Sequence, residues 1–409
     1  MVLFAEIVIF LLLQSKSRGK SRHDPYAVEG ERMEKTRKYL AVVLIAVISI
    51  AAISTVWMYL RETEFANHSH SVAKQRDYWP TASWRYSTPE TQDMDSTKLE
   101  EMMEYIRSEG FLLDSVVIVR NGYVVLEEYP RPSFYTQNRT HLLYSATKSF
   151  TSMLIGIALK EGYIDNVKHK LVDYFPNRSI ANMDSRKQAI TLENVLTMTS
   201  GLQWDEWTYS LGDQRNSVTN MTSTIDWIQF VLDKPMAHEP GTVWTYNGGG
   251  SHLLSAVLKE ATQTDPRTYA REKLLDPLGI TNWHWATDYQ GLPLGFSHLF
   301  LRPLDMAKLG FLYLNKGAWD GEQIVPIEWV DASTKAYYTV FPETDYQYGY
   351  QWWMRPSKEY FWAWGMAGQT IAVIPDYDMV VVFTGSVTDH DPEDYLINNY
   401  ILPSATTPQ

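Results

Sequence analysis

Hydrophobic residues gather in two neighbouring runs, 115–120 and 123–129, which the dipeptide Asn121-Gly122 separates. Both runs are rich in valine and other residues that favour strands. Asn-Gly between two such runs is the strongest short-range signal for a β-hairpin, because both residues tolerate the left-handed backbone of a tight turn. The pattern therefore predicts an antiparallel hairpin.

Helical patterns lie on both sides of this hairpin. Asp95 precedes apolar positions at helical spacing and Gly110 follows them, which predicts a helix over 96–109. A strongly apolar helix is predicted over 145–159. By the same criteria, further helices are expected at 191–199, 223–233, 249–262, 266–276, 303–316, 326–333 and 393–400.

Strand patterns return near the C-terminal end of the chain. They cover 348–354, 360–364, 370–374 and 379–384. A sheet whose strands come from both ends of the chain, with helices inserted between them, is an α+β arrangement. We expect a central antiparallel sheet flanked by helices in one domain over 95–402. A mainly helical subdomain is expected at about 160–335, and residues 61–94 form a spacer or a strap over the domain.

A long apolar run precedes the globular part. Residues 39–60 contain no charged side chain and match the roughly 20 residues that span a bilayer. Basic residues cluster directly before this run, so the positive-inside rule puts residues 1–38 in the cytoplasm and the later domain outside the cell. We expect an uncleaved, single-pass signal-anchor in the cell membrane. The alternatives are a cleaved signal peptide with a secreted product, and a start of the chain at Met33.

Composition narrows the chemistry. The 409 residues include no cysteine, which excludes a thiol nucleophile, a disulfide and a cysteine-ligated metal. The ten histidines lack metal-ligand spacing, so neither a metal nor another cofactor is expected. The net charge is −12 although the first 38 residues are net basic. An acidic body argues against a nucleic-acid partner, because phosphate contacts need a basic surface.

Ser145 and Lys148 provide the first candidate for catalysis. Three residues apart at the start of a helix, their side chains project from one face, and the amine comes within reach of the hydroxyl. Such an amine can activate a serine nucleophile without a histidine. The positive end of the helix dipole favours the neutral, proton-accepting lysine. Two fixed positions in four recur by chance, so an ordinary helix start is the alternative.

Three further motifs follow in the chain. They are Ile190–Leu202 around a Thr-Ser-Gly turn, Pro240–Gly248 with Tyr246, and Trp364–Gln369 ahead of a strand. With the Ser-x-x-Lys motif, this order resembles the β-lactamase-related serine hydrolases over about residues 95–402. The group includes class C β-lactamases, D-alanyl-D-alanine peptidases, EstB-like esterases and 6-aminohexanoate-dimer hydrolases. The resemblance implies a β-lactamase/transpeptidase-like fold and an acyl-enzyme mechanism.

The resemblance also implies roles for individual residues. Ser145 would be the nucleophile, Lys148 its base and Tyr246 the group that passes a proton to the leaving group. Backbone N–H groups of Ser145 and Met366 would form the oxyanion hole. Substrate contacts are assigned to Asn247, Trp364 and Gly365. For Asn247 the alternative is a role in shaping the turn, and for Trp364 it is packing.

Departures from the family pattern reduce the classes of substrate that we expect. Residues 360–366 contain neither Lys nor His, which relatives with carboxylate-bearing substrates present there. Gly248 replaces the asparagine of the Tyr-x-Asn motif, and Met198 replaces a usual histidine. The sequence therefore predicts a membrane-anchored hydrolase of a small amide or ester. A β-lactamase or D-Ala-D-Ala carboxypeptidase (a penicillin-binding protein) is one alternative, and a catalytically silent binding protein of the same fold is the other.

Overall fold

The computed structural model describes residues 76–341, 343–387 and 392–406. The apolar run 39–60 and both of its flanks lie outside the described residues. Within the described part, no helix combines the length and the apolar character needed to cross a membrane.

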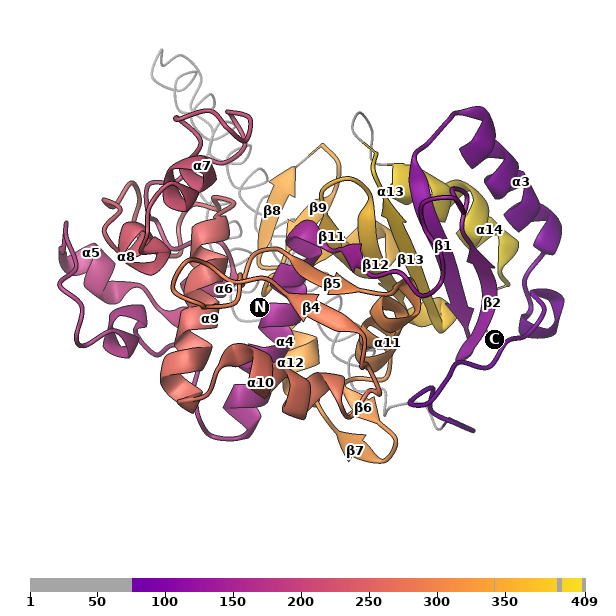
Figure 1. Cartoon of the computed structure of the whole chain (residues 1–409), viewed down its shortest axis with the longest axis horizontal. Coiled ribbons are helices and arrows are strands. Elements are labelled where there is room, and N and C mark those ends of the chain that lie inside the picture. The colour runs from indigo at the N-terminus through magenta and orange to yellow at the C-terminus, as the bar shows by residue number, and fades with distance from the viewer. Residues whose placement is uncertain (1–75, 342, 388–391, 407–409) are drawn as a thin grey trace, which may run out of the picture. The chain divides into compact units, whose positions relative to one another are not determined.

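An eight-stranded sheet forms the centre of the fold (Figure 1), and all of its neighbouring strands are antiparallel. The order is β2-β1-β13-β12-β11-β10-β9-β8, so strands from the two ends of the chain meet where β1 pairs with β13. The strands are β1 (Leu113–Arg120), β2 (Tyr123–Glu128), β8 (Tyr338–Phe341), β9 (Tyr346–Tyr348), β10 (Trp353–Arg355), β11 (Tyr360–Gly365), β12 (Gln369–Ile374) and β13 (Met379–Gly385). The predicted α+β class with a central antiparallel sheet is confirmed.

The predicted hairpin is confirmed as β1 and β2. Arg120 pairs with Tyr123 across a two-residue turn. Asn121 and Gly122 have φ values of 52° and 88°, which is the left-handed backbone that this turn requires. A register shift after Ile118 interrupts the ladder once.

The two faces of the sheet carry two separate hydrophobic clusters. Alternate residues of β1 and β13 enter one cluster or the other, because side chains of a strand alternate between faces. Helices α4 (Thr147–Lys160) and α11 (Pro303–Leu314) pack on one face. Helices α3 (Ser96–Ser108), α13 (Pro392–Leu396) and α14 (Leu402–Ser404) cover the other (Figure 1). The predicted helix over 96–109 is therefore confirmed as α3, and the Asp95 side chain caps it.

Several predicted elements are shorter or divided in the structure. The expected strand 348–354 breaks into β9 and β10, because Gln351 has a left-handed φ of 64°. The helix expected at 191–199 is limited to α6 (Leu192–Leu196), and 223–233 is α8 (Trp227–Leu232) behind a separate α7 (Ser217–Thr222).

The helical part beside the sheet is less extensive than the range 160–335. Its further helices are α5 (Ser185–Ala189), α9 (Gly248–Thr262) and α10 (Pro266–Ala270). A small sheet that the sequence pattern did not predict follows, with the strands β3 (His141–Leu142), β5 (Leu299–Leu301) and β4 (Trp283–Trp285). A two-stranded sheet, β6 (Ala318–Trp319) and β7 (Glu322–Gln323), precedes α12 (Ile327–Ser333).

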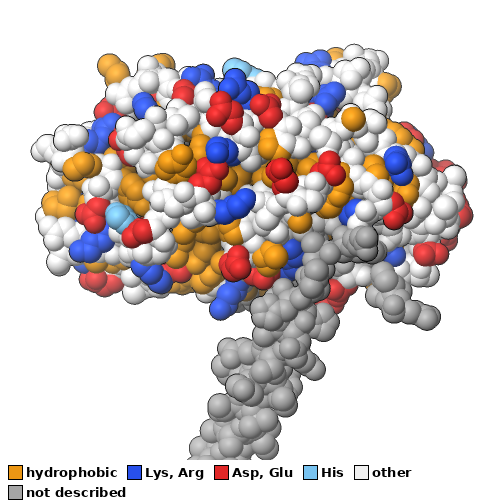
Figure 2. All heavy atoms as spheres, turned by 90° about the horizontal axis from the view of Figure 1, so that it is seen from below, with side chains coloured by type: hydrophobic (Ala, Val, Ile, Leu, Met, Phe, Trp, Pro, Cys, Tyr) orange, Lys and Arg blue, Asp and Glu red, His pale blue; other side chains and the backbone are white. Residues whose placement is uncertain are grey.

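Residues 76–94 lie against the domain. Trp84 is buried and packs on Phe311 of α11. The Arg76 guanidinium forms two hydrogen bonds, 2.6 and 2.7 Å long, with the Asp378 carboxylate before β13. On the face drawn in Figure 2, acidic and basic side chains are interspersed rather than gathered into one large region of a single sign.

Candidate active site

Ser145 lies in a 3₁₀ turn, Tyr144–Ala146, that leads directly into α4. Tyr144 has a left-handed φ of 45°, which is unfavourable for a residue with a Cβ and is held here by its surroundings. The Lys148 ammonium donates a hydrogen bond to Ser145 Oγ at 3.0 Å and another to the Phe296 carbonyl oxygen at 3.1 Å. The two side chains that the Ser-x-x-Lys spacing brings together therefore meet directly.

Tyr246 also contacts Lys148. The lysine nitrogen lies over the Tyr246 ring, 4.7 Å from its centroid, and 5.8 Å from the centroid of the Phe296 ring. Lys148 is only 2% exposed, so a carbonyl oxygen and two aromatic faces replace water around its charge. The serine, the lysine and the tyrosine thus form one contiguous group of side chains from α4 and from the segment before α9.

Two backbone contacts with Met198 hold Tyr246 in position. The N–H of Thr245 donates to the Met198 carbonyl oxygen at 2.8 Å, and the N–H of Asn247 donates to Met198 Sδ at 3.2 Å. The residue that replaces the family's histidine is therefore part of the scaffold. Asn247 Oδ1 accepts from Gly250 N at 2.8 Å and caps α9, and its side chain is buried. This geometry supports the interpretation that Asn247 shapes the turn.

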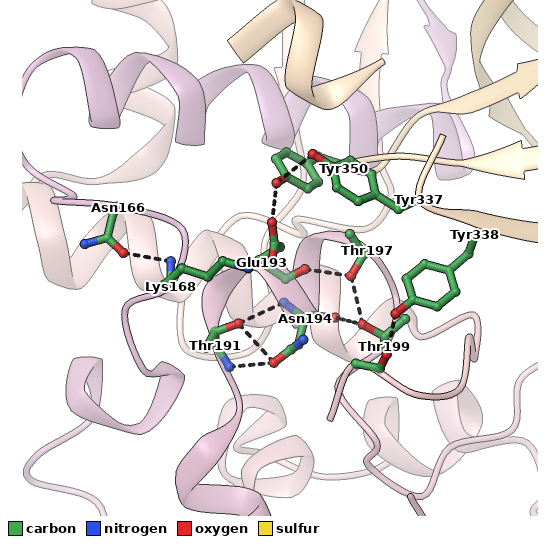
Figure 3. A network of polar contacts seen from close by, with 11 residues as sticks. Asn166, Lys168, Thr191, Glu193, Asn194, Thr197, Thr199, Tyr337, Tyr338 and Tyr350 are labelled. Carbon is green, nitrogen blue, oxygen red and sulfur yellow. Dashed lines mark hydrogen bonds and ion pairs between the residues drawn. The ribbon is translucent and has the colours of Figure 1, made fainter. Parts of the chain in front are cut away.

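A polar network surrounds α6, which precedes Met198 in the chain (Figure 3). Glu193 accepts hydrogen bonds from Tyr350 at 2.6 Å and from Lys168, and the Tyr337 hydroxyl donates to Tyr350 at 2.9 Å. Burial alone would raise the pKa of Glu193, but the hydrogen bonds from Lys168 and Tyr350 outweigh it and hold the pKa below its ordinary value.

The same network reaches the segment that carries Tyr246. The Thr197 and Thr199 hydroxyls are 2.8 Å apart, and the Gly241 N–H donates to the Thr199 carbonyl oxygen at 2.8 Å. The Tyr338 hydroxyl of β8 donates to the Gly241 carbonyl oxygen (Figure 3). The Thr-Ser-Gly motif is therefore a structural link between α6, the sheet and the loop before Tyr246.

Gly365, at the end of β11, presses against the turn that carries Ser145. A Cβ atom at Gly365 would lie 2.2 Å from the Leu143 carbonyl oxygen and 3.1 Å from the Ser145 nitrogen. Only glycine permits this close approach. The next residue, Met366, is exposed at the edge of the site. The backbone donors proposed for the oxyanion hole therefore come from two segments in direct contact.

Glu206 is a residue of the site that sequence reasoning missed. Its carboxylate accepts from the backbone N–H of Gly248 and from Trp204 Nε1, both at 2.6 Å. Burial raises the pKa of Glu206 above its ordinary value, and the positive charge of Lys148 only partly opposes this. A Cβ at Gly248 would lie 3.0 Å from Glu206 Oε2, so the absence of an asparagine side chain there makes room for this carboxylate. No spacing in the sequence links Glu206 to Lys148.

Trp352, Trp353 and Trp364 differ in their surroundings. Trp352 is fully buried and stacks on Tyr313 at 4.5 Å, so it belongs to the core. Trp353 packs 6.1 Å from the Tyr246 ring, and Trp364 is partly exposed and meets Trp353 edge-on at 5.2 Å. Trp207, which the motifs did not single out, stacks on Tyr246 at 4.9 Å.

Comparisons with known proteins agree with this geometry. The beta-lactamase family model matches residues 97–402. A 6-aminohexanoate-dimer hydrolase from Paenarthrobacter ureafaciens is 22% identical over 361 residues, which cover 80% of this chain and 88% of that protein. A monacolin J acid methylbutanoyltransferase from Aspergillus terreus is 29% identical over 152 residues, which are 34% of this chain and only 36% of that enzyme.

Solved structures share the fold at low sequence identity. A putative 6-aminohexanoate-dimer hydrolase from Bacillus anthracis has a TM-score of 0.65 and 21% identity, covering 82% of this chain and 89% of its own. EstCE1, a hydrolase with promiscuous acyltransferase activity, has a TM-score of 0.64 and 14% identity, covering 75% and 98%. The family match over most of the chain and the meeting of Ser145 with Lys148 lead to one conclusion: this chain belongs to the beta-lactamase family of serine hydrolases.

Proposed function

We propose that the protein hydrolyses a small amide or ester through an acyl-enzyme on Ser145. The observation that carries this proposal is the contact of Lys148 with both Ser145 Oγ and the Tyr246 ring in a buried setting. Hydrolysis by a serine needs a base for the hydroxyl proton and an acid for the leaving group. One lysine and one tyrosine in contact can supply both.

The reaction proceeds in two displacements. Ser145 Oγ attacks the carbonyl carbon while Lys148 takes the hydroxyl proton, and the negative charge on the former carbonyl oxygen meets the N–H groups of Ser145 and Met366. The tetrahedral intermediate breaks its bond to the leaving group, which receives a proton from Tyr246. Lys148 passes the serine proton on to Tyr246, which restores both groups. Water then attacks the resulting ester and gives one proton to Lys148, which hands it to Ser145 Oγ as the ester bond breaks and the carboxylic acid leaves.

We propose that the substrate carries no carboxylate close to the scissile bond. Residues 360–366 offer no Lys or His, and the acidic Glu206 lies beside Lys148. Both features disfavour a substrate carboxylate, because β11 offers it no cation and Glu206 already lies close to the charge of Lys148. This supports an uncharged amide or ester over a β-lactam or a D-Ala-D-Ala peptide.

The mechanism is tested by covalent labelling with a fluorophosphonate probe. Ser145→Ala is expected to abolish labelling and turnover on an ester panel. Lys148→Ala should lower kcat/KM nearly as much, because groups that act as one unit are strongly non-additive. Lys160→Ala, at the exposed end of the same helix, is the control and should leave both unchanged.

Two outcomes would contradict the mechanism. Labelling that persists in Ser145→Ala at the same site excludes Ser145 as the nucleophile. Folded wild-type protein that neither reacts with the probe nor turns over any ester or short amide favours the silent binding protein. Rapid hydrolysis of nitrocefin, or labelling by fluorescent penicillin, would favour the β-lactamase or the peptidase.

We further propose that residues 39–60 anchor the enzyme in the cell membrane with the catalytic domain outside. The support is the uncharged length of this segment and the basic cluster before it.

A further inference from the structure

Trp207 lies half-exposed directly beside the catalytic tyrosine. The residue is 49% exposed, yet its backbone is fixed by a side-chain-capped turn. The N–H groups of Trp207 and Thr208 both donate to Asp205 Oδ1, at 3.2 and 3.0 Å. The Asn216 side chain donates to the carbonyl oxygen of Glu206 at 3.2 Å. A large apolar ring whose backbone is fixed by hydrogen bonds and whose face is exposed to solvent is suited to bind an apolar group.

Four rings stack in one cluster, which we call the aromatic wall: Trp207, Tyr246, Phe341 and Trp353. The Trp207 ring is nearly parallel to the other three. The angles are 25° to Tyr246, 18° to Phe341 and 15° to Trp353, at centroid distances of 4.9, 5.8 and 6.5 Å. Tyr246 and Trp353 are buried behind, whereas Trp207 and Phe341 are 49% and 36% exposed. The wall therefore presents ring area to a molecule that enters the site.

The position of Tyr246 tells which part of a substrate meets the wall. In the proposed function, on which this inference rests, Tyr246 hands its proton to the leaving group. The wall continues from the Tyr246 ring through Trp207. A group that accepts the tyrosine proton therefore departs along the wall. The acyl group instead stays bonded to Ser145, which contacts Lys148 and has no ring contact with the wall in the described residues.

The charges around the wall favour an uncharged leaving group over an anionic one. None of the four wall residues has a basic side chain, and Glu206 lies next to Trp207 in the chain with its carboxylate facing the start of α9. An anionic leaving group would meet this carboxylate, and the wall itself supplies no cation to compensate. We infer that the aromatic wall is the leaving-group subsite, and that it selects esters and amides whose alcohol or amine part is flat, apolar and uncharged.

The test compares two acetate esters that share one acyl group. Benzyl acetate and ethyl acetate differ in the ring of the alcohol, and their alcohols leave with similar intrinsic reactivity. The wild-type protein is expected to prefer benzyl acetate in kcat/KM by about tenfold or more, since ring contacts in a prepared site are worth that order of free energy. 4-Carboxybenzyl acetate should lose this preference, because its carboxylate faces Glu206.

Variants then assign the preference to the wall. Trp207→Ala should lower the benzyl-to-ethyl ratio about tenfold, and Trp207→Phe should retain most of it. Phe341→Ala, which has no ring contact with Tyr246 among the described pairs, should lower the ratio by about threefold. Tyr163→Ala removes an aromatic side chain that is 48% exposed and packs on Tyr269, and it should leave the ratio unchanged.

The two displacements distinguish a leaving-group subsite from an acyl-group subsite. A leaving-group subsite acts only on formation of the acyl-enzyme, so the rate of deacylation after a burst must be the same in Trp207→Ala and wild type. A wild-type enzyme without benzyl preference overturns the inference. It is equally overturned if Trp207→Ala instead changes the preference between ethyl hexanoate and ethyl acetate. If the wild-type protein shows no turnover that Ser145→Ala abolishes, the proposed function itself is refuted.

Discussion

Lys148 is an ionisable side chain that is 98% shielded from water, and it makes contacts that suit both of its protonation states. As an ammonium it donates to Ser145 Oγ and to the Phe296 carbonyl oxygen. As an amine it faces the same serine hydroxyl and can accept its proton. Glu206 adds a negative charge nearby without forming an ion pair of its own with the lysine in the described residues. In the proposed mechanism the proton of Ser145 therefore moves to Lys148 over this one hydrogen bond.

His141 shows how burial close to the nucleophile makes stability depend on pH. It lies in β3, four residues before Ser145, is 4% exposed and packs on Tyr135 at 4.8 Å. Burial, assisted by the positive charge of Arg139, lowers the pKa of His141 from 6.5 to about 4. Between these values the unfolded chain binds a proton that the folded protein does not. The free energy of unfolding should therefore fall as the pH drops from 6.5 to 4, by up to about 3 kcal/mol.

Chemical denaturation at several pH values measures this effect. His141→Gln is expected to flatten the decline between pH 6.5 and 4, while His284→Gln, at an exposed position of β4, should keep the wild-type slope. Equal slopes in His141→Gln and wild type would show that His141 is not the group responsible.

At the scale of elements, the site depends on how closely β11 approaches the turn before α4. The strand reaches the backbone of residues 143–146 because Gly365 has no side chain. The loop that carries Tyr246 depends in turn on α6 and the Met198 contacts. Gln351 joins these elements: it accepts from Ser149 of α4 and Ser251 of α9, both at 2.6 Å. The groups proposed for catalysis are thus positioned by contacts between elements, and no single element carries all of them.

Gly365→Ala tests the approach of β11 to the nucleophile. The new methyl group would lie 2.2 Å from the Leu143 carbonyl oxygen, so the strand and the turn must separate. We expect kcat/KM to fall by about 100-fold, the order observed when one oxyanion donor is lost. Gly110→Ala is the control. Its φ of 70° strains an alanine in the same way as any left-handed position, but the methyl group would meet no atom within 4 Å, so kcat/KM should be unchanged. Wild-type activity in Gly365→Ala would contradict the role given to this contact.

At the scale of the whole molecule, one sheet joins the two ends of the catalytic domain. Strand β1 pairs with the C-terminal strand β13 inside the sheet, β2 forms one edge, and the chain between β1 and β13 brings Tyr246 beside Lys148. Residues 76–94 also belong to this unit, through Trp84 and the ion pair of Arg76 with Asp378. The described enzyme is therefore a folded unit from residue 76 onward, and the segment proposed as its anchor precedes it.

The proposed anchor is tested by extraction of cell membranes with alkaline carbonate. The full chain should stay in the membrane pellet, because about 20 apolar residues stably span a bilayer. A chain that lacks residues 39–60 should be released, and a chain with the basic cluster 34–38 neutralised should remain in the pellet with a disturbed orientation. Release of the full chain by carbonate would contradict a membrane-spanning anchor, and a shortened mature chain in the medium would favour the cleaved signal peptide.

The sequence by itself determined the features that depend on neighbouring residues. The Asn121-Gly122 hairpin, the helix capped by Asp95 and the Ser145–Lys148 pair all follow from local backbone preferences and helical spacing, and the structure contains each of them. The order of the four motifs was sufficient to indicate the family. The motif Pro240–Gly248 indicates Tyr246, but it does not give the distance of Tyr246 from Lys148.

Only the tertiary structure decided the features that depend on contacts between distant segments. Glu206 and Trp207 lie in a loop without a motif, and they join the site because the loop folds against α9 and Tyr246. The break at Gln351 and the small sheet of β3, β4 and β5 likewise arise from packing rather than from local preference. A pattern along the chain records which face of an element is apolar, but it does not record which remote side chain that face will meet.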